Sequence, residues 1–481
     1  KALLELPEVP REICPKSSLH QMMQVMVPGK TLFKDIYALK PGHMMVVKKS
    51  NSGFEVKEHC YWDANFPENK HHSQDSEESL IHQTRDKLVE SVALRLEADV
   101  PVACYLSGGI DSCSILGMAS SIQQSPVKGF TISFDDDKFD EAQIATEMAK
   151  SCNADQDILN VSAQDLYGKN FEKALWHSER TFYNTLGVAK MLMSQHVTQS
   201  GYKVVITGEG SDEIFGGYAA FKRDMFLHGG VGQGMEMDAK LKASNQVFSG
   251  SILAEKNVDH PAFKDLMGFT PSWIQPWMLT LEKVKPLLSN EVKEELEGYD
   301  PIAAIAESFD PRPLRNRHPL DQAQYTWIKT MLEGQILNWG GDRVDMAYSL
   351  ESRPAFLDHH VVEFAISIPP QLRIRDGVEK WVLREAMKNI LPETLYNREK
   401  FAFMAPPSHT DKKKWDAINN LMKNYVGETS RRSAKILDDS HWNLFLSEYE
   451  ASSDPSFKTR GDIIINHLVQ LHALKEMFAC N

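Results

Sequence analysis

Residues 102–113 read VACYLSGGIDSC, and this stretch decides the fold class. Its first five residues form a short apolar run typical of a buried strand, and the serine and glycines that follow predict a tight turn. Glycines let backbone N–H groups turn toward an anion, and the helix that we expect next adds the positive end of its dipole. The stretch therefore predicts a phosphate-binding turn at the carboxyl end of a strand. Its candidate ligand residues are Ser107, Gly108, Gly109 and Ser112.

Acidic residues accompany this turn. Asp111 lies inside it, where a carboxylate would repel phosphate unless a divalent cation lay between them. A second strand-like run ends in TGEGSDEIFGGY (207–218), which places Glu209, Asp212 and Glu213 within five positions. Such a cluster favours a metal or a proton-transfer role, and Asp212 suits a cation shared with Asp111. The alternative for either stretch is a plain helix cap, because acids are favoured in the first turn of a helix.

Outward from these two turns, short β-rich runs alternate with helical stretches. The run 129–134 (GFTISF) lies between the two turns, and a helical pattern begins at Glu77. This alternation predicts an α/β fold with a parallel sheet, helices on both faces and a ligand at the carboxyl ends of the strands. From about residue 222 the pattern is helical, which predicts a large helical C-terminal part.

The N-terminal part has a different pattern. Residues 1–66 predict a small all-β unit, with a hairpin turn at 51–53 between two strand-like runs. Residues 67–76 are polar without an apolar period and predict a linker. We expect the adjacent His71 and His72 in this linker to be solvated rather than to bind a metal.

The composition excludes several classes of protein. The chain has 481 residues, 42% of them hydrophobic and 25% charged, which is typical of a globular protein. Its net charge of −13 disfavours nucleic acid and membranes as the main partner. No apolar run approaches the ~18 residues of a membrane span, and six widely spaced cysteines favour reduced thiols in a cytoplasmic protein. The first residue is Lys1 rather than Met, and the sequence that follows already resembles the interior of a domain, so we expect the natural protein to begin earlier.

Six motifs in a fixed order resemble the synthetase half of glutamine-dependent asparagine synthetases, members of the ATP-pyrophosphatase (N-type) superfamily. They are SGGIDS (107–112), TISFDD…FDEA (131–142), TGEGSDEIFGGY (207–218), DRVDMAYSLESRPAFLD (342–358), KWVLREA (380–386) and REKFAF (398–403). The resemblance implies an adenine nucleotide alpha hydrolase-like synthetase domain over 77–481, with a helical insertion at about 222–320. Residues 1–66 resemble the last strands of that family's glutaminase domain. Its N-terminal nucleophilic cysteine does not stand in this chain, which as given cannot hydrolyse glutamine by that route.

The resemblance also implies an amide ligase that depends on ATP and Mg²⁺. A carboxylate, by default L-aspartate giving L-asparagine, would attack ATP to form an acyl-adenylate and pyrophosphate. Ammonia, normally from glutamine, would then displace AMP. By this resemblance Asp111 and Asp212 carry Mg²⁺, and Lys400 reaches the α-phosphate. The positions that match ATP-binding residues are Leu106, Ser107, Gly108, Gly109, Asp111, Ser112, Ile132, Thr207 and Gly208.

Glu209 and Glu351 are the candidates for proton transfer. In relatives that close a lactam ring, a tyrosine stands in the place of Glu209 and pairs with the glutamate that matches Glu351. A carboxylate at position 209 agrees with the use of free ammonia, whose proton it could accept during attack on the acyl-adenylate. For Glu351 the alternative is a structural ion pair with Arg343 or Arg353.

Departures from the family pattern leave the substrate open. They fall at 152–157 (CNADQD), 179–182 (ERTF) and 350–358 (LESRPAFLD), and the second lies near the expected acceptor acid. With the long segment 222–320 they favour a second reading, an amidotransferase or cyclase of secondary metabolism that acts on a larger acid. A binding protein without activity and a tRNA-modifying enzyme are weaker alternatives. We expect small-molecule partners, no nucleic acid and no membrane, and a homodimer stays open.

Overall fold

The computed structural model describes residues 1–51, 53–136, 138–230, 241, 252–399 and 404–480. At its centre lies a five-stranded sheet in the order β5-β4-β3-β6-β7, with every neighbouring pair parallel. The strands are β3 (Val102–Tyr105), β4 (Lys128–Phe134), β5 (Asp155–Val161), β6 (Val204–Thr207) and β7 (Glu351–Pro354). The chain adds β4 and β5 on one side of β3, and β6 and β7 on the other. The strand order therefore switches between β3 and β6, where open α/β sheets bind their ligands.

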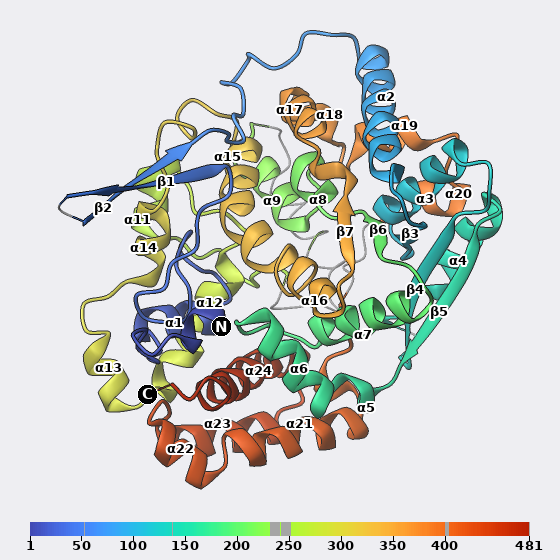
Figure 1. Cartoon of the computed structure of the whole chain (residues 1–481). Helices are drawn as coiled ribbons and strands as arrows, with labels where there is room; N and C mark the ends of the chain where they lie inside the picture. Colours follow the sequence, from blue (N-terminus) through green and yellow to red (C-terminus); the bar gives the residue numbers. More distant parts are fainter. Residues whose placement is uncertain (52, 137, 231–240, 242–251, 400–403, 481) are drawn as a thin grey trace.

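Helices cover both faces of this sheet (Figure 1), which confirms the predicted α/β class. On one face lie α2 (Glu77–Leu96), α3 (Ile110–Ile122) and α4 (Ala142–Ser151), and on the other α7 (Leu186–Gln199) and α16 (Asp342–Asp345). The inner strands β3 and β6 are buried along most of their length, as strands enclosed on two sides must be. Helix α2 begins where the sequence predicts it, because the Ser76 side chain accepts a hydrogen bond from the backbone N–H of Ser79.

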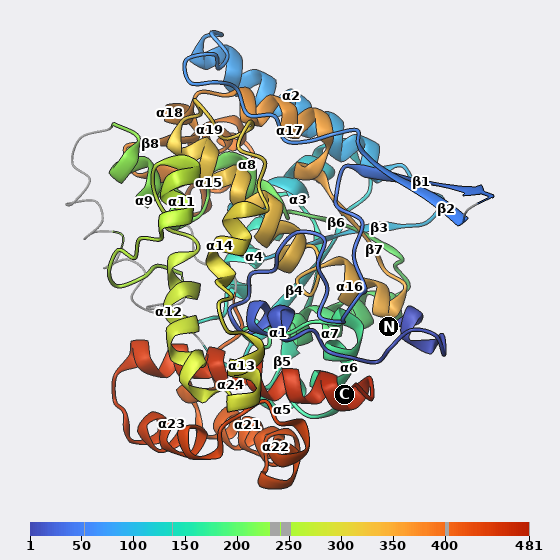
Figure 2. The same cartoon turned by 90° about the vertical axis from the view of Figure 1, so that its left-hand side faces the viewer.

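The C-terminal part is helical, as predicted. In Figures 1 and 2 the helices α21 to α24 lie together at one end of the molecule, and α24 is buried along most of its length. The C-terminal helices are α21 (Lys412–Tyr425), α22 (Glu428–Ala434), α23 (Asp439–Ala451) and α24 (Pro455–Met477). Elsewhere in the chain the structure describes α5 (Ala163–Leu166), α6 (Lys169–Ser178), α8 (Ser211–Phe215), α9 (Ala219–His228), α11 (Pro261–Met267), α12 (Gln275–Val284), α13 (Asn290–Glu295) and α14 (Pro301–Glu307). It also describes α15 (Pro319–Trp327), the π-helix η4 (Ile328–Ile336), α17 (His359–Ser367), α18 (Pro370–Arg373), α19 (Trp381–Met387) and α20 (Glu393–Tyr396). No helix in the described ranges meets the length and apolarity that a membrane crossing requires.

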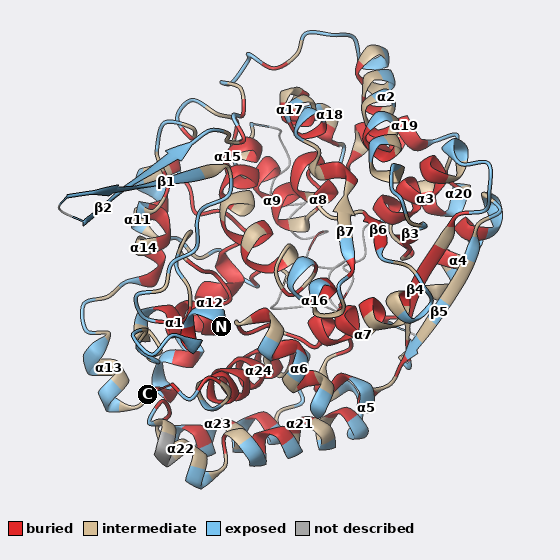
Figure 3. Ribbon diagram, in the orientation of Figure 1, coloured by how far each residue is buried: buried red, intermediate tan, exposed pale blue. Residues whose placement is uncertain are grey.

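The N-terminal residues correct one expectation. The predicted hairpin is present as β1 (His43–Ser50) and β2 (Gly53–Cys60), and Figure 3 shows it exposed on both faces. The segment is not all-β, however, because α1 (Pro15–Met22) precedes the hairpin. Proline at the first helical position favours a helix start, and α1 buries most of its side chains against α12, α14 and α24.

The linker 67–76 contains neither a helix nor a strand, as predicted, but His72 is not solvated. Its ring is buried, and Nε2 lies 2.9 Å from a carboxylate oxygen of Asp321, which also pairs with the buried Arg373. The expectation for His72 was wrong because the buried carboxylate of Asp321 lies next to the linker and binds the ring. His71 is exposed, as expected. Two very short strands, β8 (Ile374–Arg375) and β9 (Val378–Glu379), form a hairpin just before α19.

Candidate functional site

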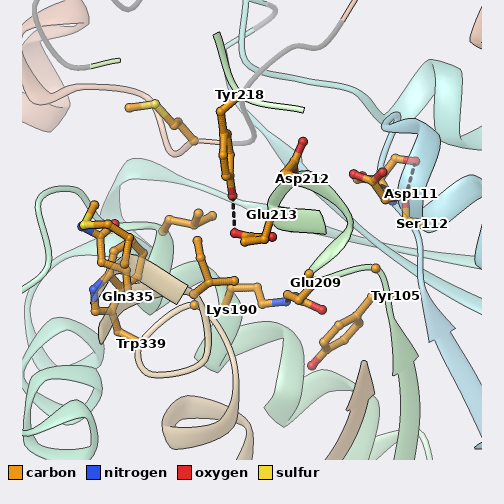
Figure 4. A pocket seen from close by; sticks show the side chains of 18 of the residues that line it. Tyr105, Asp111, Ser112, Lys190, Glu209, Asp212, Glu213, Tyr218, Gln335 and Trp339 are labelled. Atoms are coloured by element: carbon orange, nitrogen blue, oxygen red, sulfur yellow. Dashed lines mark hydrogen bonds and ion pairs between the residues drawn. The ribbon is translucent and has the colours of Figure 1, made fainter. Parts of the chain in front are cut away.

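A cavity of about 290 Å³ lies at the carboxyl ends of β3, β4 and β6 (Figure 4). Eight residues that the sequence nominated line it: Leu106, Ser107, Asp111, Ser112, Ile132, Gly208, Glu209 and Asp212. Gly108, Gly109 and Thr207 stand beside them in the same two turns, and Lys400 lies outside the described residues. The switch point of the sheet and the cavity therefore coincide.

The turn after β3 is held by its own serine hydroxyls. The backbone N–H of Ser107 donates to Ser112 Oγ at 3.0 Å, and the two serine Oγ atoms lie 2.9 Å apart. The N–H of Gly109 points to Ser107 Oγ at 3.2 Å, and α3 starts at the next residue. Gly208 lets the second turn approach this closely, since a Cβ there would lie 3.0 Å from Asp111 Cβ. Hydroxyls and N–H groups at a helix start form a cradle suited to an anion.

Asp111 and Asp212 meet at one buried ammonium. Lys380 Nζ lies 2.6 Å and 2.7 Å from the two carboxylate oxygens of Asp111 and 2.6 Å from Asp212 Oδ1. The Lys380 side chain is 0% exposed, and its backbone has a φ of 54° at the entry to α19. Lys380 begins the motif KWVLREA (380–386), but no role for this lysine was predicted from the sequence. The predicted meeting of Asp111 and Asp212 was a usable signal, because two carboxylates at one place require a cation, and a lysine in another motif can supply it.

A second lysine lies deeper in the cavity. Lys190 Nζ is 3.1 Å from Glu209 Oε1 and 4.2 Å from the centre of the Tyr105 ring. Burial acts to raise the pKa of Glu209, but the charge of Lys190 together with hydrogen bonds from Thr207 and Lys190 outweighs burial and holds that pKa below its usual value. Beneath them Asp345 accepts hydrogen bonds from Tyr105 and Ser194, and burial raises its pKa. Lys190 therefore keeps Glu209 ionised.

The surroundings of Glu213 instead favour its protonated form. Its Oε1 accepts hydrogen bonds from Tyr218 Oη at 2.8 Å and from Trp327 Nε1 at 3.1 Å. Burial, with the nearby charge of Asp212, raises the pKa of Glu213 to about 7. In the metal-free protein this carboxyl group thus titrates near neutral pH.

This shift predicts a pH-dependent effect of Glu213→Gln. Between pH 4.5 and 7 the folded protein holds a proton on Glu213 that the unfolded chain has lost, so the free energy of unfolding falls as pH rises through that window. Glutamine does not titrate, so the variant does not lose stability in this window, and the glutamine carbonyl can still accept hydrogen bonds from Tyr218 and Trp327. We expect the variant to exceed the parent by about 2–3 kcal/mol at pH 8 and to match it below pH 4.5. Urea unfolding in EDTA measures this, with the exposed Glu307→Gln as control; equal differences at both pH values would contradict it.

Aromatic side chains form the rest of the cavity wall. Tyr183 contacts Trp277 and Trp339, each with ring centres 5.5 Å apart, and Trp327 contacts Trp273 at 5.9 Å. All five line the cavity, together with Met331, Gln335 and Ile336 from the π-helix η4. In Figure 4 Lys190 and Glu209 lie between the Asp111–Ser112 end and the Gln335–Trp339 end. One cavity therefore joins a polar end to a large apolar end.

The structure does not bring Glu351 to this cavity. Glu351 begins β7 and pairs in register with Val204 at the start of β6, whereas the cavity lies at the opposite ends of these strands. Its side chain is 58% exposed and forms an ion pair with Arg353 at 2.7 Å. Arg343 instead pairs with Glu179. Of the two alternatives for Glu351, the geometry thus agrees with the structural ion pair.

Comparisons with known proteins agree with this geometry. The family model described as asparagine synthase matches residues 83–473. The amidase chyE of Penicillium rubens is 32% identical over 452 residues, which cover 87% of this chain and 64% of that protein. The amidase chry2 of Gibberella zeae is 32% identical over 428 residues (82% and 62%), and asparagine synthetase [glutamine-hydrolyzing] 1 of Bacillus subtilis 28% over 462 (92% and 67%). The aligned part of this chain spans less than two thirds of the length of either amidase.

Proposed function

The chain belongs to the asparagine synthase family, and from this premise we propose that it is an ATP-dependent amide ligase. It would activate a carboxylic acid as an acyl-adenylate, release pyrophosphate, and then exchange AMP for ammonia. One observation carries the proposal: Asp111 and Asp212, from two strand ends, meet at a single cation beside a serine–glycine anion cradle. In this proposal residues 77–481 form the synthetase unit, and 1–66 belong to a glutaminase-type unit that supplies the ammonia.

Magnesium fits the two aspartates. Mg²⁺ prefers oxygen ligands and is commonly bound by one or two carboxylates together with substrate phosphates. Asp111 and Asp212 supply such carboxylates, and they already share one cation-sized position. Within the described residues no group of three or more His, Cys, Asp or Glu side chains could hold a metal, so phosphate oxygens would complete the set. When bound, the ion would offset negative charge on the leaving pyrophosphate.

The remaining roles in this proposal are those that membership of the family implies. Ser107, Gly109 and Ser112 would hold the β- and γ-phosphates, while Leu106, Ile132 and Gly208 would contact adenosine. Lys380 adds a positive charge at the same end. Glu209, ionised beside Lys190, would accept the proton that nitrogen loses as it attacks the acyl carbon. The role of Lys400 at the α-phosphate stays a prediction.

For the acceptor, the cavity supports the reading in which the acid is larger than aspartate. Trp273, Trp277, Trp327 and Trp339 line the wall beyond Lys190, and an aspartate side chain would leave that apolar surface in contact with water. A carboxylic acid with a bulky apolar body would bury it. The names of chyE and chry2, both amidases, also point to chemistry at an amide bond.

Pyrophosphate release with a panel of acids tests both parts of this proposal. With ATP, Mg²⁺ and ammonium, we expect apolar acids such as indole-3-carboxylate or benzoate to support release at least about tenfold faster than L-aspartate, because each buried aromatic body adds binding free energy. Release with L-aspartate alone would overturn the larger acceptor and keep the ligase. An absence of ATP turnover with a broad panel of apolar, aliphatic and amino acids would overturn the ligase itself.

A further inference from the structure

Three motifs that lie far apart in the sequence meet at the guanidinium of Arg398. Its Nη1 donates to the backbone carbonyl of Gly108, in the turn after β3. Its Nη2 lies 2.8 Å from Glu141 Oε1, and the Glu141 side chain is 5% exposed at the start of α4. The guanidinium thus ties the back of the anion cradle to a buried carboxylate on another element.

The geometry of the peptide bond makes this contact relevant to phosphate. In a planar trans peptide the carbonyl of Gly108 and the N–H of Gly109 point in opposite directions. Arg398 holds the carbonyl on the outside, so the N–H must point inward, and it does point to Ser107 Oγ at 3.2 Å. Ser107 Oγ in turn contacts Ser112 Oγ, and both serines line the cavity. Fixing one carbonyl therefore fixes a donor inside the cradle.

Gly108 is required by this contact rather than by its backbone angles. Gly108 is not among the residues with positive φ, so other residues could adopt its conformation. A Cβ at this position would, however, lie 2.7 Å from Arg398 Nη1 and 2.9 Å from Glu141 Cβ. The absence of a side chain is what lets the guanidinium reach the carbonyl.

We propose that Arg398 is a positioning residue for the triphosphate: it fixes the Gly108–Gly109 peptide plane so that the Gly109 N–H stays on the cradle side and holds Ser107 Oγ in place for the β- and γ-phosphates. Glu141 anchors the guanidinium in that position. The inference rests on the proposed function only in naming ATP and pyrophosphate as the anions. Preorganised N–H donors are effective because binding then requires no reorientation of the backbone.

Direct binding of magnesium pyrophosphate, measured by calorimetry without any acceptor acid, tests the inference. We expect Arg398→Met to weaken pyrophosphate binding and to raise the KM for ATP about tenfold, the effect of one charge-assisted hydrogen bond. The KM for the acceptor acid should change less than about twofold. Arg398→Lys should restore part of the binding, because an ammonium can still donate to the carbonyl. Arg312→Met, at an exposed arginine, is the matched control.

Two results would overturn this role. One is unchanged pyrophosphate binding in Arg398→Met. The other is an equal rise in the KM of ATP and of the acid with no rescue by lysine, since a general loosening of the fold would affect both. Gly108→Ala provides a second variant, and its added Cβ should weaken pyrophosphate binding through displacement of the guanidinium. Failure of the parent protein to bind ATP or pyrophosphate would instead contradict the proposed function.

Discussion

Lys380→Met is expected to lower the free energy of unfolding by about 3–5 kcal/mol, the usual cost of removing one partner from a buried ion pair. The ammonium is fully buried, and it lies within 2.7 Å of both carboxylate oxygens of Asp111 and of Asp212 Oδ1. Methionine has a similar length, so the change removes charge with little loss of packing. Two carboxylates would then face each other with less positive charge between them. Urea unfolding in EDTA measures the loss.

The same variant tests whether the Lys380 ammonium occupies a position between Asp111 and Asp212 that Mg²⁺ can also occupy. In Lys380→Met we expect millimolar Mg²⁺ to recover part of the lost stability, because a cation that binds only the folded state stabilises it. The parent protein without ATP should respond less, since Lys380 occupies that position. Lys412→Met, at a lysine whose side chain is 85% exposed, should lose no more than about 1 kcal/mol. A Lys380→Met variant as stable as Lys412→Met would disprove the importance of the buried contact.

Asp111→Asn is expected to reduce pyrophosphate release by about a thousandfold, a loss typical when a ligand of the metal ion that offsets the charge of the phosphates is removed. Asparagine has the same shape and can still accept a hydrogen bond from Lys380, so the fold should persist. Steady-state release with ATP, Mg²⁺ and the best acid of the panel measures the effect. The half-saturating concentration of Mg²⁺ should rise as well, because one of its two carboxylates is gone.

Asp155→Asn is the matched control for this change. Asp155 begins β5, its side chain is 66% exposed, and its partner is the surface residue Lys128. We expect release within about twofold of the parent, as for most exposed substitutions. Undiminished release in Asp111→Asn would refute the assignment of Asp111 to the phosphates and to Mg²⁺.

Within the central sheet, the sequence predicted the three inner strands. The runs that became β3, β4 and β6 are enclosed between helices and are mostly buried, and apolar residues predominate in them. It missed β5 and β7, because these are the edge strands of the sheet. β5 (DQDILNV) is half exposed and carries polar residues, and β7 (ESRP) has no aliphatic residue at all. The side chains of these edge strands are less buried than those of the inner strands, so they need not be apolar, and the sequence pattern of a strand is weak.

In the candidate site, the sequence predicted those features whose residues lie close together in the chain. The two turns were recognised, and the structure brings Asp111 and Asp212 to one position, although their role as magnesium ligands stays a prediction. Lys380 was missed because a lysine next to a short hairpin has the usual pattern of a solvated residue. The aromatic wall could not be predicted either. Its tryptophans come from α12, from α15 and from turns next to α12 and η4, and no spacing in the sequence indicates that their rings meet.

The Gly108–Arg398 and Asp111–Lys380 contacts join residues that are 290 and 269 positions apart in the chain. Loops of this length close late, because each such contact must first overcome the entropy of the intervening chain. During synthesis the helical C-terminal third must therefore emerge before the cradle acquires its shape. The proposed nucleotide affinity would then be a property of the finished chain, because a fragment that ends before residue 398 lacks the guanidinium that holds the Gly108 carbonyl.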